Sequence, residues 1–430
     1  MGGCISKNNY MGGNNVKRRS RKNILPLQRC INDIHVWITP DIELEEFNDI
    51  VRSAYSMLYL LATNIAQFDK RFQHDKIIGV GSAFDGTKIK ELNEMDFVLH
   101  VNVPTDSTIL VAGDDPCRAH ISVSEGSKEQ WKDMCDFSGY LSDNLLIPFK
   151  VLCVLRSLLI KAIEEINSNT DKQKIIRDSG ELSLASNQID GSGPNEIVYM
   201  QWMSANSKKV TQISIDIVFA FRCDKEILLD IRDNIRKDVW EFIWTESEGV
   251  GLVTPSRGSN KRCRLCSKRV CPCWVFQFSD IECKMVNKTI QNNHWKCYRV
   301  LKYICQSDFA IKNHTTLKCL SSNMIKNIVL EHDHTCFGKN TQECFIDIVN
   351  RLYSGAIDCF LPKFILPKTN IWCFDEETLC PKPPDQIISN LFEFVHRLKA
   401  SDIKHYSLTQ ELQFIQRHLH IKFGQIDQSY

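Results

Sequence analysis

The sequence predicts an α+β fold with two lobes, a mixed lobe of strands and helices followed by a helical lobe, with a cleft between them. Up to about Cys283, short runs of alternating apolar residues are mixed with helical patterns, and beyond it three- and four-residue spacing dominates. The composition, 43% hydrophobic and 24% charged over 430 residues, is that of a globular protein. It excludes global disorder, collagen-like chains and coiled coils. The predicted boundaries are a tail at 1–28, a core lobe with a long N-terminal spine helix at 29–285 and the helical lobe at 286–430.

The core lobe opens with this long helix. Its apolar residues recur at three- and four-residue spacing from Phe47 to Phe72, as on one face of an amphipathic helix. Thr39 is a candidate N-cap, and Pro40 suits the first helical position. We therefore expect the stripe to pack in the core and to carry no chemistry.

The remaining elements follow from the same two patterns. In the core lobe, the predicted strands are 76–80, 97–103, 210–221 and 274–278, the hairpin is 182–205 and the helix is 145–166. In the helical lobe, the predicted helices are 294–305, 317–330, 342–352, 387–398 and 408–418.

The N-terminal tail is polar and basic, and we expect it to be disordered. Residues 1–29 hold seven basic residues and no acidic one, so with a total charge of +1 the rest of the chain carries −6. Gly2 with Ser6 fits the N-myristoylation pattern, and Cys4 is a candidate palmitoylation site. An acyl chain and a basic cluster together would hold the protein on a membrane surface. The alternative is an unmodified tail that binds anions loosely.

The cysteines indicate the compartment. Nineteen cysteines in 430 residues fall below the density of disulfide scaffolds, and the first thirty residues contain no apolar run typical of a secretory signal. We therefore expect reduced thiols and a cytoplasmic protein, on the cytosolic face of a membrane if the tail is lipidated. The best membrane-span candidate, 145–163, carries a proline and three basic residues and is rejected.

Three acidic residues form the most informative pattern. Glu94 and Asp96 alternate at the start of a predicted strand, so they share a face. Asp216 lies among apolar residues in a later strand, where an acid is costly unless it is paired or binds a cation. Three acids converging on one sheet face can hold two Mg²⁺ or Mn²⁺ ions. The alternative for Glu94 and Asp96 alone is a pair of solvated acids at a strand end.

A glycine and a serine complete the pattern. Gly81 and Ser82 end a predicted strand, and at a strand-to-helix turn their backbone N–H groups would face a triphosphate. This combination is the arrangement of polymerase-β-type nucleotidyltransferases.

Longer stretches carry a family resemblance. Residues 77–101, 212–221 and 274–304 resemble cyclic GMP–AMP synthase (cGAS) and the animal cGAS-like receptors, within the Mab-twenty-one superfamily. The matching text is Gly81-Ser82 through Thr87-Lys88-Ile89, Asn93-Glu94-Met95-Asp96, Ile213-Ser-Ile-Asp216-Ile217 and Trp274 through Ser279-Asp-Ile-Glu282. The resemblance covers about residues 40–400.

The resemblance implies a bilobal polymerase-β-type fold and synthesis of a cyclic dinucleotide from ATP and/or GTP, and the sequence leaves open which bases and which linkages the product contains. It implies that Glu94, Asp96 and Asp216 are the metal ligands and that Gly81 and Ser82 bind the donor phosphates. Further nucleotide contacts carried over by position are Ser279, Glu282, Lys302 and His314.

The chain departs from the family at three places. Val275 stands where the family commonly has an arginine, and Thr315 where it has a base-stacking tyrosine. The zinc-binding insertion of vertebrate cGAS, which grips DNA, is missing after His294, and Cys297 with His294 cannot build that site. Double-stranded RNA is therefore the first choice of activating ligand and double-stranded DNA the second.

Two further groups of cysteine and histidine are candidates for metal sites. The spacing Cys263-x₂-Cys266-x₄-Cys271-x-Cys273 offers four thiolates to a Zn²⁺ ion inside a basic loop, and the alternative is a flexible loop with free thiols. The run from His332 to Cys336 is interpreted as polar loop between helices.

Two functions remain open at this point. The first is a ligand-activated enzyme whose cyclic dinucleotide acts on a downstream receptor in innate immunity. The second is a catalytically silent, membrane-tethered scaffold of the same superfamily. The three acids favour the enzyme, whereas Val275 and Thr315 favour the scaffold.

Overall fold

The computed structural model describes residues 26–111, 116–135, 144–169, 174–192, 195–255, 271–290, 292–306, 321–358 and 360–371. The chain divides into two compact units. The first comprises the residues up to Pro40, Thr87–Lys90 and those from Met285 onward, and the second comprises Asp41–Gly86 and Glu91–Lys284.

Ten strands of the described chain form one sheet in the second unit. Their order is β3-β4-β10-β9-β8-β7-β6-β5, while β2 pairs with β8 and with β1. Most neighbours are antiparallel, but β2 and β8 run parallel. The strands are β1 (His74–Val80), β2 (Glu94–Asn102), β3 (Thr108–Val111), β4 (Arg118–Ser122), β5 (Lys174–Arg177), β6 (Gly180–Ser192), β7 (Asn195–Ser204), β8 (Val210–Cys223), β9 (Val250–Val253) and β10 (Trp274–Gln277).

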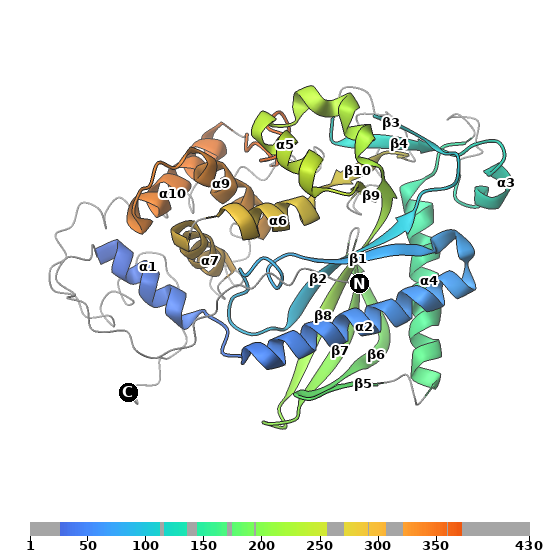
Figure 1. The fold of residues 1–430 in the computed structure, drawn as a ribbon, viewed down its shortest axis with the longest axis horizontal. Coiled ribbons are helices and arrows are strands. Elements are labelled where there is room, and N and C mark those ends of the chain that lie inside the picture. The colour runs from blue at the N-terminus through green and yellow to red at the C-terminus, as the bar shows by residue number, and fades with distance from the viewer. Residues whose placement is uncertain are drawn as a thin grey trace. The chain divides into compact units, whose positions relative to one another are not determined.

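Two long helices, α2 (Leu44–Phe68) and α4 (Pro148–Ser168), pack on one face of this sheet (Figure 1). Leu61 of α2, Leu159 of α4 and Phe97 of β2 are among the side chains that surround one small internal void. Because successive side chains of a strand point to opposite faces, the residues on either side of Phe97 project from the other face of the sheet. That opposite face carries a small apolar cluster that includes Val98, Ala220 and Val253.

Shorter helices complete the second unit. They are η2 (Lys70–Phe72), α3 (Lys128–Trp131), η3 (Lys225–Asn234) and α5 (Lys237–Glu246), and α6 (Ser279–Thr289) leads from this unit into the other. None of the helices in the described ranges combines the length and apolarity needed to cross a bilayer.

The first unit is helical in its described part. Its helices are α1 (Pro26–Trp37), α7 (Asn292–Gln306), α9 (Ser322–Thr335) and α10 (Thr341–Ile357). Each of them contributes to one apolar core, with Ile31, Leu301, Ile328 and Phe345 all at most 3% exposed. The spacing of these residues along each helix is the one expected for a buried stripe.

The structure corrects several expected boundaries. The long helix begins at Leu44, because Thr39 donates its hydroxyl hydrogen to the carbonyl of His35 and so ends α1 rather than starting α2. Helix α1 was not predicted, and its first turn includes residues 26–28 of the expected tail. The interpretation of 332–336 as loop is wrong for His332 and His334, which lie in the last turn of α9.

Other expectations are not tested. Residues 1–25, 387–398 and 408–418 lie outside the described residues. The arrangement of two lobes about a cleft and the role of α2 as a spine stay predictions.

Candidate active site

Parallel strands bring two acids side by side. Asp96 of β2 and Asp216 of β8 are register partners, and Glu94 lies two residues before Asp96 on the same face. The carboxylates of all three residues offer oxygens within 4.8 Å of one another. Glu94 is exposed and the two aspartates are partly buried, so the cluster is open to solvent. The structure therefore brings together the three acids that the sequence pattern predicted to converge.

The apolar pattern of the two strands explains this placement. Met95 and Phe97 of β2 are fully buried, as is Ile215 of β8, on the face covered by helices. The alternate residues must then project from the opposite face. The acids at positions 96 and 216 therefore lie outside the apolar core, and both strands remain regular.

Gly81 closes the site on one side. It follows β1, whose last residue, Val80, is the register partner of Asp96. Gly81 has φ +72°, and a Cβ atom there would lie 2.2 Å from Oδ2 of Asp96. Only glycine allows both this backbone conformation and this close approach.

The turn after Gly81 differs from the expectation. The carbonyl of Gly81 accepts hydrogen bonds from the backbone N–H groups of Phe84 and Asp85, at 3.1 and 3.0 Å. Residues 82–93, all described, contain turns and irregular chain but no helix. The expected helix N-terminus at Ser82 is therefore wrong. Any phosphate contact here depends on the turn itself and on the partly buried Ser82.

Polar neighbours of the acids could not be predicted from the local pattern, because they lie on other strands. Ser214 holds the start of β2, donating from its backbone N–H and its hydroxyl to the carbonyl of Asn93, at 2.9 and 3.2 Å. On β7, Tyr199 donates its hydroxyl hydrogen to Oδ2 of Asp190 at 2.7 Å. That bond raises the pKa of Tyr199, and the charges of Asp190 and Asp216 raise it further.

The predicted nucleotide contacts fall on several elements. Ser279 begins α6 and is partly buried, and Glu282 lies in the same helix at 6% exposure. Lys302 lies in α7 and is 7% exposed. His314 and Thr315 lie outside the described residues. Beside Ser279, burial raises the pKa of Asp280 although the charge of Lys284 opposes the shift.

Val275, the departure from the family pattern, has an informative neighbour. Its register partners are Val253 on β9 and Arg118 on β4. Directly opposed residues of antiparallel strands project from the same face, and Val253 in turn pairs with Ala220 of β8. Ala220 shares the face of Asp216, since four residues separate them along β8. Arg118 therefore projects from the acidic face, and it was missed because β4 was not predicted.

The other predicted site residues are only partly described. Cys263, Cys266, Gly2 and Cys4 lie outside the described residues. Cys271 is partly buried, and Cys273 is buried with its Sγ 3.3 Å from Nε2 of His120. A zinc site in that loop and lipidation of the tail stay predictions.

The comparison with known families agrees with this geometry. The family described as Mab-21 protein nucleotidyltransferase domain matches residues 83–288, a range that contains Glu94, Asp96 and Asp216. No curated protein is a significant match to the chain. The range also contains the greater part of the sheet that positions the three acids. Residues 83–288 accordingly match the Mab-21 nucleotidyltransferase domain family, in agreement with the resemblance seen in the sequence.

Proposed function

We propose that this protein is a nucleic-acid-sensing nucleotidyltransferase that makes a cyclic dinucleotide second messenger, such as cyclic GMP–AMP, from ATP and GTP. The carboxylate cluster of Glu94, Asp96 and Asp216 carries the proposal. Three like charges this close repel one another, so the arrangement is costly for a protein that makes no use of it. The family match of residues 83–288 supports the reaction class.

The cluster fits divalent cations. Carboxylate oxygens are the ligands that Mg²⁺ and Mn²⁺ prefer, and all three acids reach solvent. Gly81 has no side chain, so it leaves the space beside the carboxylate of Asp96 unfilled. When bound to the three carboxylates, two cations would neutralise phosphate charge and stabilise the attacking and leaving oxygens.

The residues of the chain then have distinct tasks. Gly81 and Ser82 would hold the triphosphate of the donor nucleotide at the turn after β1. Asp216 would help to remove the proton from a ribose hydroxyl of the second nucleotide. That oxygen forms a bond to the α-phosphorus, and the bond from this phosphorus to the β-phosphate bridging oxygen breaks, releasing pyrophosphate. A second transfer in the reverse sense closes the ring.

Other residues would bind the nucleotides. Ser279, Glu282, Lys302 and His314 keep the roles that the resemblance implies. Arg118 would supply the positive charge that Val275 lacks, since it is the register partner of Val275 and projects from the acidic face.

The wider role is part of the same proposal. Double-stranded RNA is the preferred activating ligand and double-stranded DNA the second candidate. Either duplex would be recognised by its backbone and shape, so activation should weaken with salt and not depend on sequence. The product would act on a cyclic-dinucleotide receptor in innate immune signalling. The N-terminal tail would attach the protein to the cytosolic face of a membrane.

The competing function is a catalytically silent scaffold, and one assay separates the two. Full-length protein is incubated with Mg²⁺ or Mn²⁺, labelled ATP and GTP, and duplex RNA, duplex DNA or neither. The proposed enzyme yields a phosphatase-resistant cyclic product that depends on a duplex. If no nucleotide is transferred under any of these conditions, the scaffold is the better assignment.

A further inference from the structure

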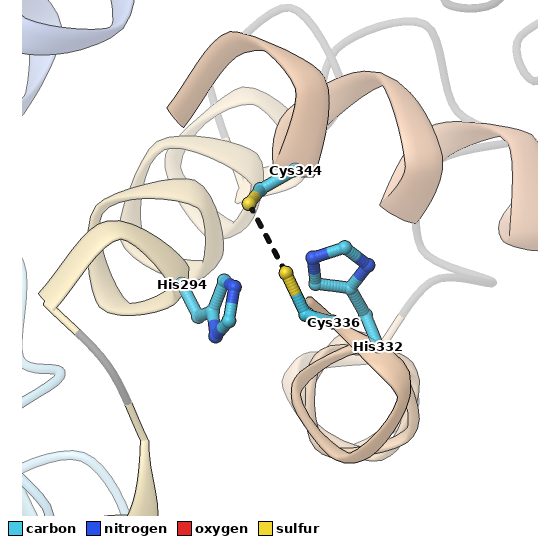
Figure 2. Close-up of side chains that lie close together, drawn as sticks. All are labelled: His294, His332, Cys336 and Cys344. Atoms are coloured by element: carbon cyan, nitrogen blue, oxygen red, sulfur yellow. Dashed lines mark hydrogen bonds between the residues drawn. The ribbon is translucent and has the colours of Figure 1, made fainter. Parts of the chain in front are cut away.

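Four side chains from three helices and the residue that follows one of them meet inside the helical unit. His294 lies in α7, His332 in α9, Cys336 directly after α9 and Cys344 in α10. Each of the four offers one ligand atom within 4.8 Å of the others. Figure 2 shows the two imidazole rings on either side of the paired thiols. Both histidines are 0% exposed, Cys344 is fully buried and Cys336 is partly buried.

Two carboxylates fix the histidine rings. Nδ1 of His294 lies 2.5 Å from Oδ1 of Asp333, and Nδ1 of His332 lies 2.6 Å from Oδ2 of Asp347. A carboxylate can only accept, so each Nδ1 carries the hydrogen, and each neutral ring keeps its lone pair on Nε2. Both Nε2 atoms are buried without a hydrogen-bond partner among the described residues. Histidines that bind zinc usually donate their other ring N–H to a carboxylate, which fixes the orientation of the ring.

The spacing of the thiols fits a metal better than a disulfide. Sγ of Cys336 and Sγ of Cys344 lie 3.8 Å apart. Two thiolates on one tetrahedral zinc, with Zn–S bonds of about 2.3 Å, lie about 3.8 Å from each other. A disulfide requires about 2.05 Å.

The charges also balance. Two thiolates and two neutral imidazoles carry two negative charges, which one dication cancels. A buried site of this kind leaves no net charge in the helical core, so it avoids the cost of an isolated buried ion. Without a cation, the buried Nε2 of His332 would lack a hydrogen bond, at about 1–3 kcal/mol, and that of His294 would have only the weak thiol donor of Cys336 beside it.

We propose that His294, His332, Cys336 and Cys344 form a structural zinc site that fastens α7, α9 and α10 together. Four protein ligands close the coordination sphere, as in structural rather than catalytic zinc sites. Metal binding releases the two thiol protons and adds its free energy to folding of the helical unit. The inference does not depend on the proposed function, because none of the four residues belongs to the carboxylate cluster.

The first test measures metal in the full-length protein. Elemental analysis should find about one zinc per chain held by this site, and a second one if the loop at Cys263–Cys273 also binds zinc. Replacement of zinc by Co²⁺ should give the intense visible bands of a tetrahedral ion and a thiolate charge-transfer band. Purified protein without stoichiometric zinc, or with Cys336 and Cys344 joined in a disulfide, overturns the proposal.

Substitutions then assign the ion to this site. Cys336→Ser with Cys344→Ser should remove one zinc per chain, whereas Cys263→Ala with Cys266→Ala should not affect this ion. Cys305→Ala is the matched control, because Cys305 is a buried cysteine of the same unit outside the cluster. If the double serine variant retains the same zinc content as the wild type, the assignment is wrong.

Loss of a zinc ligand could prevent folding, so a second pair of variants leaves all four ligands in place. Asp333→Asn and Asp347→Asn keep size but weaken the support of each histidine. Competition with a chelator should show zinc affinity lowered by roughly 10- to 100-fold in each variant. His334→Asn serves as control, because His334 lies in the same turn but outside the cluster. Unchanged affinity in both aspartate variants would contradict the proposed geometry.

Discussion

The hydroxyl of Tyr55 in α2 accepts a hydrogen bond from the backbone N–H of Gly79 at 2.8 Å. Gly79 lies in β1, two residues before the glycine that contacts Asp96. The bond therefore ties a core helix to the strand that positions the acidic site. Burial raises the pKa of Tyr55, and the bond from Gly79 opposes that shift.

Tyr55→Phe should destabilise the protein by about 1–3 kcal/mol, because the N–H of Gly79 loses its partner in a partly buried position. Chemical denaturation measures this change. Tyr59→Phe, at an exposed tyrosine of the same helix, should change stability far less. Equal effects of the two substitutions would show that the Tyr55 bond has no special role.

Gly81→Ala should lower nucleotidyl transfer by roughly 100-fold, the scale expected when a catalytic group is displaced by about 1 Å. The new Cβ would meet Oδ2 of Asp96, and the left-handed backbone adds about 1–2 kcal/mol of strain. Steady-state rates of wild type and variant provide the measurement. Gly126→Ala is the control, since the nearest atom to its Cβ would be 3.9 Å away. Wild-type turnover of Gly81→Ala would remove this turn from the mechanism.

Asp216→Asn should reduce product formation by more than about 100-fold, because loss of a direct metal ligand costs more than loss of its outer support. The substitution keeps the shape of the side chain and removes its charge. Folding and duplex binding should persist, as circular dichroism and a binding titration would record. Asp230→Asn, at an exposed residue of η3, controls for loss of charge alone. Normal activity of Asp216→Asn would refute the assignment of the carboxylate cluster.

Arg118→Ala should raise KM for at least one nucleotide by roughly 10- to 100-fold, the value of one charge-assisted hydrogen bond. The turnover number should fall less, because Arg118 lies three strands away from the strand of Asp216. Arg52→Ala, at an arginine on the helix-covered side of the sheet, is the control. An unchanged KM for both ATP and GTP would exclude a role for Arg118 in binding.

His100 should make the stability depend on pH. It is 5% exposed, and burial followed by the charge of Arg222 lowers its pKa to about 4, with a smaller contribution from Lys76 and opposition from Asp75. In the unfolded chain His100 takes up a proton near pH 6.5, whereas in the native state it does so only near pH 4. Stability is therefore complete above pH 6.5 and falls by about 3 kcal/mol as the pH decreases through this window.

Denaturation of wild type and His100→Leu between pH 4 and pH 7.5 isolates this effect. The difference in unfolding free energy between the two proteins should change by about 3 kcal/mol across the window. A constant difference would mean that His100 has an ordinary pKa. His35, whose pKa burial also lowers to about 4, contributes equally to both proteins and cancels.

Local patterns were sufficient to locate the acidic site. Alternation alone placed Glu94 and Asp96 on one face, and Asp216 was conspicuous as an acid among apolar strand residues. Arg118 was not predicted because β4 spans only five residues, too short a run for its alternation to indicate a strand. Thr39 was misassigned because a threonine before a proline suits a helix start, whereas its hydroxyl bonds backward to His35.

The histidine and cysteine cluster shows a different limit. His332 and Cys336 are close in sequence, but His294 and Cys344 reach them only through the packing of α7 and α10 on α9. Spacing within one segment cannot reveal a site assembled from three helices. The two supporting aspartates, Asp333 and Asp347, are equally invisible without the folded structure.

The parallel pairing of β2 with β8 has a consequence for folding. Along the chain, β3 to β7 and α4 lie between the strand of Asp96 and the strand of Asp216. Parallel strands such as these cannot be joined by a short hairpin. Closing the long loop between the two strands reduces the entropy of the chain before any bond of the pairing has formed. Long-range contacts of this kind therefore slow folding. During synthesis, the first two acids leave the ribosome well before the third. We therefore expect the carboxylate cluster to form late in folding, and a chain that ends before β8 lacks Asp216 and so the complete cluster.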